Sequence, residues 1–185
     1  MTTQNTSLKS RKLHRRFARN AKGSVAVEFA LTAIPFFALL FAILEAGVIF
    51  FASATLDQSL NDQARLIRTG QAQTAGTTAE QLKSAICANA VFLTNCSQNL
   101  ALDVRVYDKF ANVSDPALVK DDGSVDNSKL KFNMGNAGDI VMIRALFNWS
   151  IMSPLPTGLA NNSGASGSVR LLQSTTVFRN EPYTS

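Results

Sequence analysis

The feature that most constrains this chain is a long apolar run with almost no charge. Sixteen residues from Phe29 to Leu44 carry no charged side chain, Glu45 interrupts them, and residues 46–56 are again uncharged. A helix over residues 27–52 is about 39 Å long, which exceeds a hydrocarbon core of about 30 Å. The sequence therefore predicts one membrane-spanning helix, which we place at residues 24–52.

The basic residues are concentrated before this run. Residues 1–23 hold seven of the 18 lysines and arginines and no acidic residue, whereas the rest of the chain has 11 basic and 13 acidic residues. The positive-inside rule places the basic end in the cytoplasm, so residues 53–185 are expected outside the cytoplasm, as a periplasmic domain. We expect no nucleic-acid partner, because such a domain needs a basic face of its own.

Two simpler explanations of the apolar run fit less well. The apolar part of a secretory signal peptide has about 7–15 residues and ends in an A-x-A-like site, and neither feature matches here. A plain membrane anchor fits the length but leaves Glu28 unexplained. A carboxylate in the hydrocarbon core costs about 2.5–3.5 kcal/mol or more if it is unpaired.

A cut in the backbone after Gly23 would give Glu28 a partner. The new α-amino group of Ser24 would lie about one helical turn from Glu28, at the same membrane depth. The two charges could pair within one chain or between staggered chains. Glycine before the cut and serine after it present little bulk to a protease.

This arrangement resembles the class III signal of type IV pilins and pseudopilins. In that signal a basic leader ends in glycine, a prepilin peptidase cuts after it, and glutamate is the fifth mature residue. Here Gly23 stands at the cut, Ser24 is the first mature residue, Glu28 the fifth and Phe29 the sixth. The resemblance implies that residues 1–23 form a cleaved leader.

Small residues recur along the predicted span at four-residue spacing. They are Ala26, Ala30, Ala38, Ala42, Ala46 and Ala54, and Ile34 and Phe50 interrupt the series. Small residues let membrane helices approach closely, so Ala38 and Ala42 are candidates for helix packing. Alanine is also common in membrane helices, and both interpretations stay open. Glu45 lies about 26 Å beyond Glu28, where it is expected to be solvated or to contact a partner helix.

Beyond the span the sequence predicts an α+β domain. The long helix continues into solvent as far as Thr69 and stops at Gly70, and a second short helix has Thr78 as N-cap and Gln81 in a capping box. The second helix is expected at residues 79–91, and strands at 100–107, 139–152 and 168–178. Residues 111–138 and 157–167 have the composition of loops. We expect an antiparallel sheet of three to four strands on the outer half of the long helix.

The two cysteines point to an oxidising compartment. Cys87 and Cys96 form an even pair beyond the membrane segment, which suggests a disulfide, with two reduced thiols as the alternative. The only histidine, His14, lies in the basic leader, so a zinc site and histidine-dependent catalysis outside the membrane are disfavoured. No serine-hydrolase, zinc-protease or phosphate-loop motif occurs. We expect no enzymatic activity, cofactor or metal.

A narrower resemblance covers most of residues 17–183. The segment KGSVAVEFALTAIPFFALLFAILEAGVIFF is similar to the TadE-like family, as are the cysteine pair, W-S-I-M-S-P-L-P and the closing F-R-N-E-P-Y. The resemblance implies a pilin-like minor pseudopilin of the bacterial inner membrane. Its function would be assembly of the adhesive Tad (Flp) pilus, and its partners a prepilin peptidase, other pilins, the Tad machinery and membrane lipid. Cys87 and Cys96 would form a disulfide. The alternative is an unprocessed, single-pass binding protein of the envelope.

Overall fold

The computed structural model describes residues 21–90, 92–121, 123–152, 159–160 and 169–183. Most of the predicted leader, and most of the predicted connection at 157–167, lie outside the described residues, as do Pro154 and Pro156. The chain forms two compact units, residues 1–43 and residues 44–185. We call them the N-terminal unit and the C-terminal unit, and each is described by itself.

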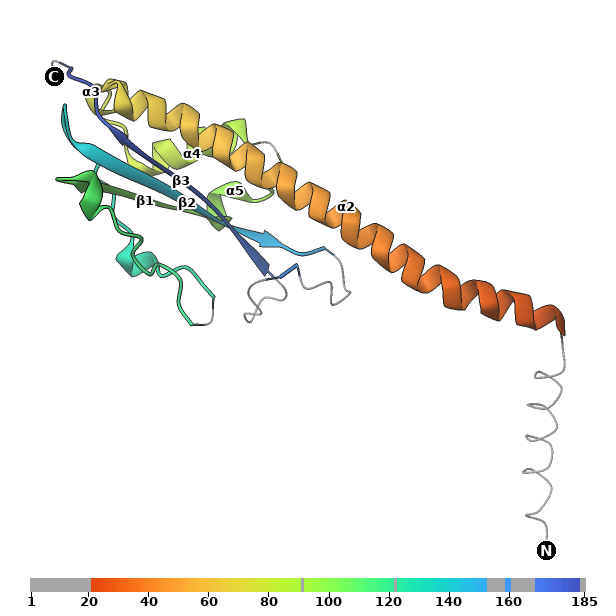
Figure 1. Ribbon diagram of the computed structural model, residues 1–185. Helices are drawn as coiled ribbons and strands as arrows, with labels where there is room; N and C mark the ends of the chain where they lie inside the picture. The colour runs from red at the N-terminus through yellow and green to blue at the C-terminus, as the bar shows by residue number, and fades with distance from the viewer. Residues whose placement is uncertain (1–20, 91, 122, 153–158, 161–168, 184–185) are drawn as a thin grey trace, which may run out of the picture. The chain divides into compact units, whose positions relative to one another are not determined.

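A single helix, α2, runs from Ala21 to Arg68 (Figure 1). It continues through Pro35, which lacks the N–H for one helical hydrogen bond. Its last turn carries Arg65 and Arg68, whose charge complements the negative end of the helix dipole. Gly70 then takes a left-handed conformation with φ of 78°, which ends the helix close to the predicted position.

The C-terminal half of α2 buries one stripe of apolar side chains. The stripe consists of Ile49, Ala52, Leu56, Leu60, Ala64 and Ile67. Their spacing of three or four residues places them on one face of the helix. This face belongs to the main hydrophobic core of the C-terminal unit.

A three-stranded antiparallel sheet supplies the other side of this core. It consists of β1 (Leu100–Tyr107), β2 (Ile140–Ser150) and β3 (Val169–Arg179) in the order β1-β2-β3. Alternate residues of β2, among them Ile143 and Phe147, belong to the main core. The intervening residues Met142 and Leu146 are also buried, so β2, the central strand, is covered on both faces. The whole is the pilin-like α+β arrangement expected.

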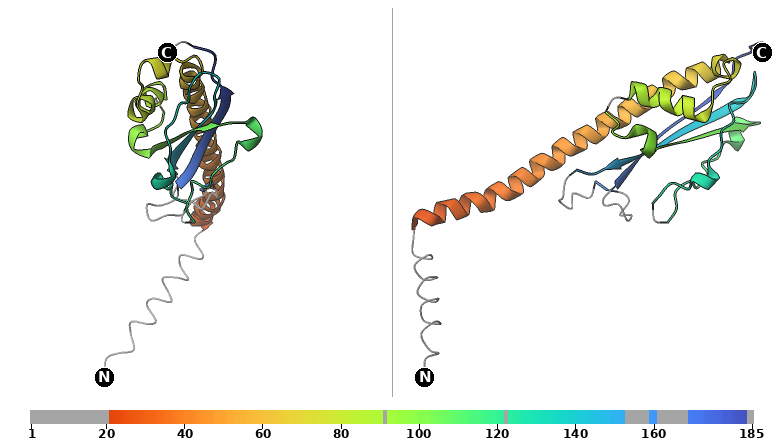
Figure 2. Two further views of the ribbon diagram at one scale, coloured as in Figure 1. Left: turned by 90° about the vertical axis from the view of Figure 1, so that its left-hand side faces the viewer. Right: turned by 180° about the vertical axis from the view of Figure 1, so that it is seen from behind.

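Short helices complete the core layer. Helix α4 (Ala79–Asn89) contributes Leu82 and Ile86, and Figure 2 shows it beside the C-terminal half of α2. Its start is the predicted capping box: Gln81 N–H donates to Thr78 Oγ1 at 3.3 Å, and Thr78 N–H donates to Gln81 Oε1 at 2.9 Å. Two one-turn helices, α3 (Gln71–Thr74) and α5 (Cys96–Asn99), are not predicted by the sequence.

The segment between β1 and β2 lies along the outer edge of β1 and over the far face of the sheet. Val104 N–H donates to the carbonyl of Lys131, and Asn133 N–H donates to the carbonyl of Val104. Leu118 is buried although it does not belong to the main core. The segment also contains the 3-10 turns η1 (Phe110–Asn112) and η2 (Asn127–Lys129).

A buried charge cluster lies on this far face. Asp103 of β1, which is 0% exposed, faces Arg144 of β2, which is 3% exposed. Asp103 accepts hydrogen bonds from Arg105 Nε at 2.7 Å and from Lys131 N–H at 2.9 Å. Arg144 also pairs with Asp115. Burial lowers the pKa of Arg144, and the carboxylate of Asp103 opposes that shift.

Asn180 joins the end of β3 to the start of β2. Its side-chain Nδ2 donates to the carbonyls of Met134 and Asn136 at 3.0 and 2.9 Å. Its backbone N–H donates to Asp139, and its carbonyl accepts from Gly138. With 2% of its surface exposed, this residue fixes the two strands at the end away from their connection.

Candidate functional site

The predicted processing segment lies at the N-terminal end of α2. Gly23 and Ser24 have helical backbone, and Glu28 and Phe29 follow on the next turn, both exposed. The backbone carbonyl of Glu28 accepts a hydrogen bond from Thr32 Oγ1 at 3.1 Å. Positions four apart on a helix are one turn apart, which is the separation that the predicted charge pair needs. Cleavage after Gly23 stays a prediction.

Residues 25–43 of the N-terminal unit present a largely apolar surface. Eleven large apolar side chains of its helix have 36% or more of their surface exposed: Val25, Val27, Phe29, Leu31, Ile34, Phe36, Phe37, Leu39, Leu40, Phe41 and Ile43. A continuous apolar surface of this kind marks contact with a membrane or with another protein. The helix is long and apolar enough to span a membrane.

The two alanines proposed for helix packing lie within this apolar surface. Ala38 and Ala42 are partly buried and stand one turn apart on α2. Whether they contact another helix stays a prediction.

Glu45 has a partner that the sequence does not signal. Its carboxylate Oε1 accepts a hydrogen bond from the backbone N–H of Met152 at 2.6 Å. The two residues belong to α2 and to the segment that follows β2, 107 positions apart. Every residue type except proline has a backbone N–H donor, so no side chain near position 152 could have indicated this contact.

A second contact joins the same part of α2 to the segment between α4 and α5. The rings of Phe51 and Phe92 meet edge to face, with centroids 4.7 Å apart. Phe92 follows α4 by three residues, within the loop that the two cysteines close. The first turns of α2 in the C-terminal unit thus hold two segments that are distant in sequence.

Cys87 and Cys96 are disulfide-bonded, as expected. Their Cα atoms are 5.6 Å apart, and the bond joins the last turn of α4 to the first residue of α5. Cys96 is buried, and Cys87 packs against the main core. The bond therefore closes the loop that carries Phe92.

Comparison with known proteins identifies the first part of this architecture. Residues 23–65 match the family model described as TadE-like protein. The chain carries a TadE-like domain. No curated protein and no solved structure gives a significant match to the chain. The TadE-like domain begins at Gly23 and includes the predicted processing segment, the apolar run, Glu45 and most of the buried stripe of α2.

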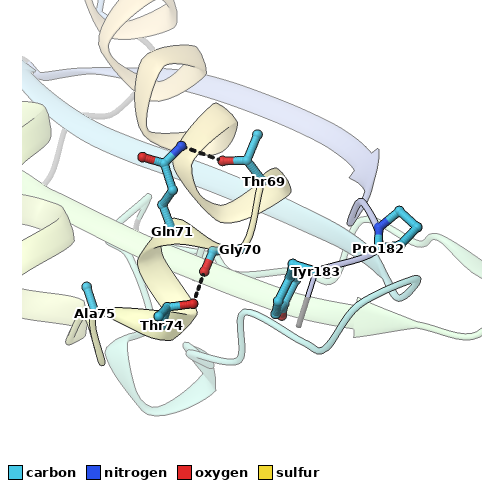
Figure 3. A pocket seen from close by; sticks show the side chains of 7 residues that line it. All are labelled: Thr69, Gly70, Gln71, Thr74, Ala75, Pro182 and Tyr183. Carbon is cyan, nitrogen blue, oxygen red and sulfur yellow. Dashed lines mark hydrogen bonds between the residues drawn. The ribbon is translucent and has the colours of Figure 1, made fainter. Parts of the chain in front are cut away.

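The C-terminal tail closes over the helix just beyond the TadE-like domain. Arg68 pairs with Glu181 at 3.1 Å, and Glu181 N–H donates to the carbonyl of Arg68. The ring of Tyr183 lies directly beside Gly70 (Figure 3), where a Cβ atom would overlap the ring. Gly70 is therefore required both by its positive φ and by this close approach.

An open pocket lies at this tail contact. It is lined by Thr69, Gly70, Gln71, Thr74, Ala75, Pro182 and Tyr183, none of which carries a charge. Its two drawn hydrogen bonds, from Gln71 to Thr69 and from Thr74 to Gly70, join neighbouring residues of the chain. The pocket is thus the gap left where the C-terminal tail packs against the end of α2 and α3.

Proposed function

We propose that this chain is a TadE-like minor pilin or pseudopilin needed for assembly of Tad (Flp) type IVb pili and for surface adherence. The observation that carries the proposal is the TadE-like match, which starts at Gly23, the residue after which the sequence predicts the cut. The role is structural, because it depends on processing, membrane insertion and subunit packing.

In this proposal a prepilin peptidase removes residues 1–23. The enzyme recognises Gly23, Glu28 and Phe29, and the exposure of the last two side chains makes them accessible to it. Cleavage frees the α-amino group of Ser24, which pairs with Glu28 in the same chain or in a staggered neighbour. The pair stabilises a carboxylate that would otherwise be costly at the membrane edge.

The mature protein resides in the bacterial inner membrane, with its N-terminus in the cytoplasm and the C-terminal unit in the periplasm. The seven basic residues before the span support this orientation, and the disulfide fits an oxidising compartment. The partners of the chain are other pilins, the inner-membrane Tad machinery and membrane lipid. The exposed apolar surface of the N-terminal unit is where lipid and neighbouring helices contact it.

Intact-mass measurement tests the proposal. The full chain is produced with and without a cognate prepilin peptidase, next to a Gly23→Ala variant. In the presence of the enzyme, we expect the wild-type chain to lose residues 1–23 and to begin at Ser24, and the Gly23→Ala variant to stay uncut. A wild-type chain that keeps its leader in native membranes would favour the alternative, an anchored binding protein whose Glu28 serves another contact.

A further inference from the structure

The exposed apolar side chains of the C-terminal unit gather at one end. Among the described residues of this unit, nine large apolar side chains have 36% or more of their surface exposed. Six of them belong to the first turns of its helix or to the two segments that reach those turns: Leu44, Val48, Phe50, Phe51, Phe92 and Met152. We call these six residues the apolar end. Met152 is 84% exposed and Phe92 is 56% exposed.

The segments that form the apolar end also lack charge. No charged residue occurs in 46–56, 84–102 or 145–169, although 17% of the chain is charged. These three runs contain Phe51, Phe92 and Met152, and the structure brings them to the same part of α2 through the Phe51–Phe92 ring contact and the Glu45–Met152 hydrogen bond. Glu45, which accepts the hydrogen bond from Met152, is the single charged residue within 44–56, 84–102 and 145–169.

The position of this end along α2 matches the outer boundary of a bilayer. A hydrocarbon core of about 30 Å takes about 20 helical residues, and a span that starts at Val25 ends at Leu44. The headgroup region adds about 5–7 Å on each side, and Phe51 lies about 9 Å beyond Glu45 along the helix. Residues 45–48 thus follow the span at the level of the headgroups, where aromatic side chains act as anchors, and Phe51 lies just outside that level.

We propose that the apolar end docks on the outer leaflet of the phospholipid bilayer, with Phe92 and Met152 entering the headgroup region. The inference rests on the proposed membrane insertion of α2. Lipid is favoured over a protein partner because this end is continuous in sequence with the span. The three runs also hold no charged residue that could form an ion pair with a protein partner. An apolar contact of this kind is insensitive to salt.

Lipid-depth quenching of tryptophan fluorescence tests the docking. The full chain with its disulfide is reconstituted in phosphatidylcholine vesicles whose acyl chains carry bromine near the headgroup. All variants carry Trp149→Phe, which removes the only native tryptophan. One further change is then made in each: Phe92→Trp or Met152→Trp at the apolar end, Phe37→Trp in the span, or Phe110→Trp as control. Phe110 is 58% exposed, close to the value for Phe92, and lies in η1, outside the three runs.

We expect the brominated lipid to quench tryptophan at positions 37, 92 and 152 and to leave position 110 unchanged, at low and high salt alike. Quenching at 37 without quenching at 92 or 152 would refute the docking while leaving membrane insertion intact. No quenching at position 37 would instead refute the proposed membrane insertion of α2. Equal quenching at 92 and 110 would also overturn the proposal, because the contact would then not belong to this end.

Two further measurements separate docking from misfolding and self-association. Circular dichroism and the intact disulfide confirm that each variant folds, and the probes at 92 and 152 report on two different segments. Iodide in the aqueous phase should quench position 110 more than position 92. Protection of position 92 from both iodide and brominated lipid would mean that a second copy of the chain covers this end, which contradicts the proposal.

Discussion

The carboxylate of Glu45 accepts a hydrogen bond from the backbone N–H of Met152 at 2.6 Å. The contact joins the first turns of the C-terminal unit to the residues that follow its central strand. A charged acceptor makes this bond stronger than one between neutral groups. Glu45, which follows a long apolar run, thus holds the C-terminal end of β2 against α2.

Removing this acceptor should loosen the end of β2. We expect Glu45→Ala to lower the free energy of unfolding of the C-terminal unit by about 1.5–3 kcal/mol, the usual contribution of a hydrogen bond to a charged group. Trp149 lies near this end and is the only tryptophan, so its fluorescence during urea titration of the full chain in detergent reports the loss. Glu45→Gln keeps a carbonyl acceptor and should lose less. Equal losses in the two variants would assign the effect to packing instead.

Glu28 should matter for assembly and not for membrane insertion. Because removing a carboxylate from the membrane edge lowers the cost of insertion, we expect Glu28→Ala to insert at least as well as the wild type. It should nevertheless fail to enter pilus-forming complexes, since the α-amino group of Ser24 loses its partner. Membrane fractionation and isolation of assembled complexes measure the two effects. Normal pili in this variant would contradict the charge-pair model.

The disulfide should contribute measurable stability. Closing a loop of about ten residues is worth about 2.5–3 kcal/mol in the chain-entropy model, so the double variant Cys87→Ala, Cys96→Ala should lose about that much. The reduced wild-type chain should unfold at nearly the same urea concentration as this variant. Under non-reducing conditions the native chain should be lighter than its reduced form by the mass of two hydrogens. Free thiols in native envelope protein would rule the bond out.

The buried carboxylate of Asp103 should be among the most sensitive positions in the sheet. It is fully buried, accepts hydrogen bonds from Arg105 and from the backbone N–H of Lys131, and forms an ion pair with Arg144. Removing one partner of a buried ion pair typically costs about 3–5 kcal/mol, and we expect a loss of this size for Asp103→Asn. Asp121→Asn changes the same side chain at an exposed site, and its effect should stay within about 0.5 kcal/mol. A small effect at both positions would show that water reaches the cluster.

The tail contact can be tested with two glycines that share a backbone conformation. Gly70 and Gly76 both have positive φ, but only Gly70 lies against Tyr183, whereas a Cβ at Gly76 meets open space. Alanine in this conformation costs about 1–2 kcal/mol, which is the loss expected for Gly76→Ala. Gly70→Ala should lose clearly more. Adding Tyr183→Ala to Gly70→Ala should remove part of the difference, and equal losses at the two glycines would mean that the tail is not seated as described.

Most of the secondary structure follows from local patterns. Thr78 and Gln81 form the capping box that their spacing predicts, Gly70 ends the long helix, and the alternation from Leu100 onwards is strand β1. These elements depend on residues close together in sequence, so the pattern contains the information that determines them. The cysteine pair forms the expected disulfide. Its signal is also local, because only nine positions separate the two residues.

The long-range contacts could not be predicted in this way. Met152 reaches Glu45 through its backbone, and the partners of Asp103 come from β1, β2 and the segment between them. Tyr183 meets Gly70 across 113 positions of the sequence. Each contact depends on how distant segments pack, and a single sequence holds no signal for that. At the predicted cleavage site the signal is also local, because Gly23, Ser24, Glu28 and Phe29 lie within seven residues of one another.

Asn180 has a consequence for how the hairpin of β2 and β3 tolerates change. In a tight hairpin the turn sets the register of its strands, but here 18 residues, 151–168, separate the two strands. The bonds of Asn180 to Met134, Asn136, Gly138 and Asp139 align the strands from their opposite end. The middle of that connection therefore does not set the register of the two strands. It is the place where insertions, deletions or a grafted epitope should leave strand pairing undisturbed.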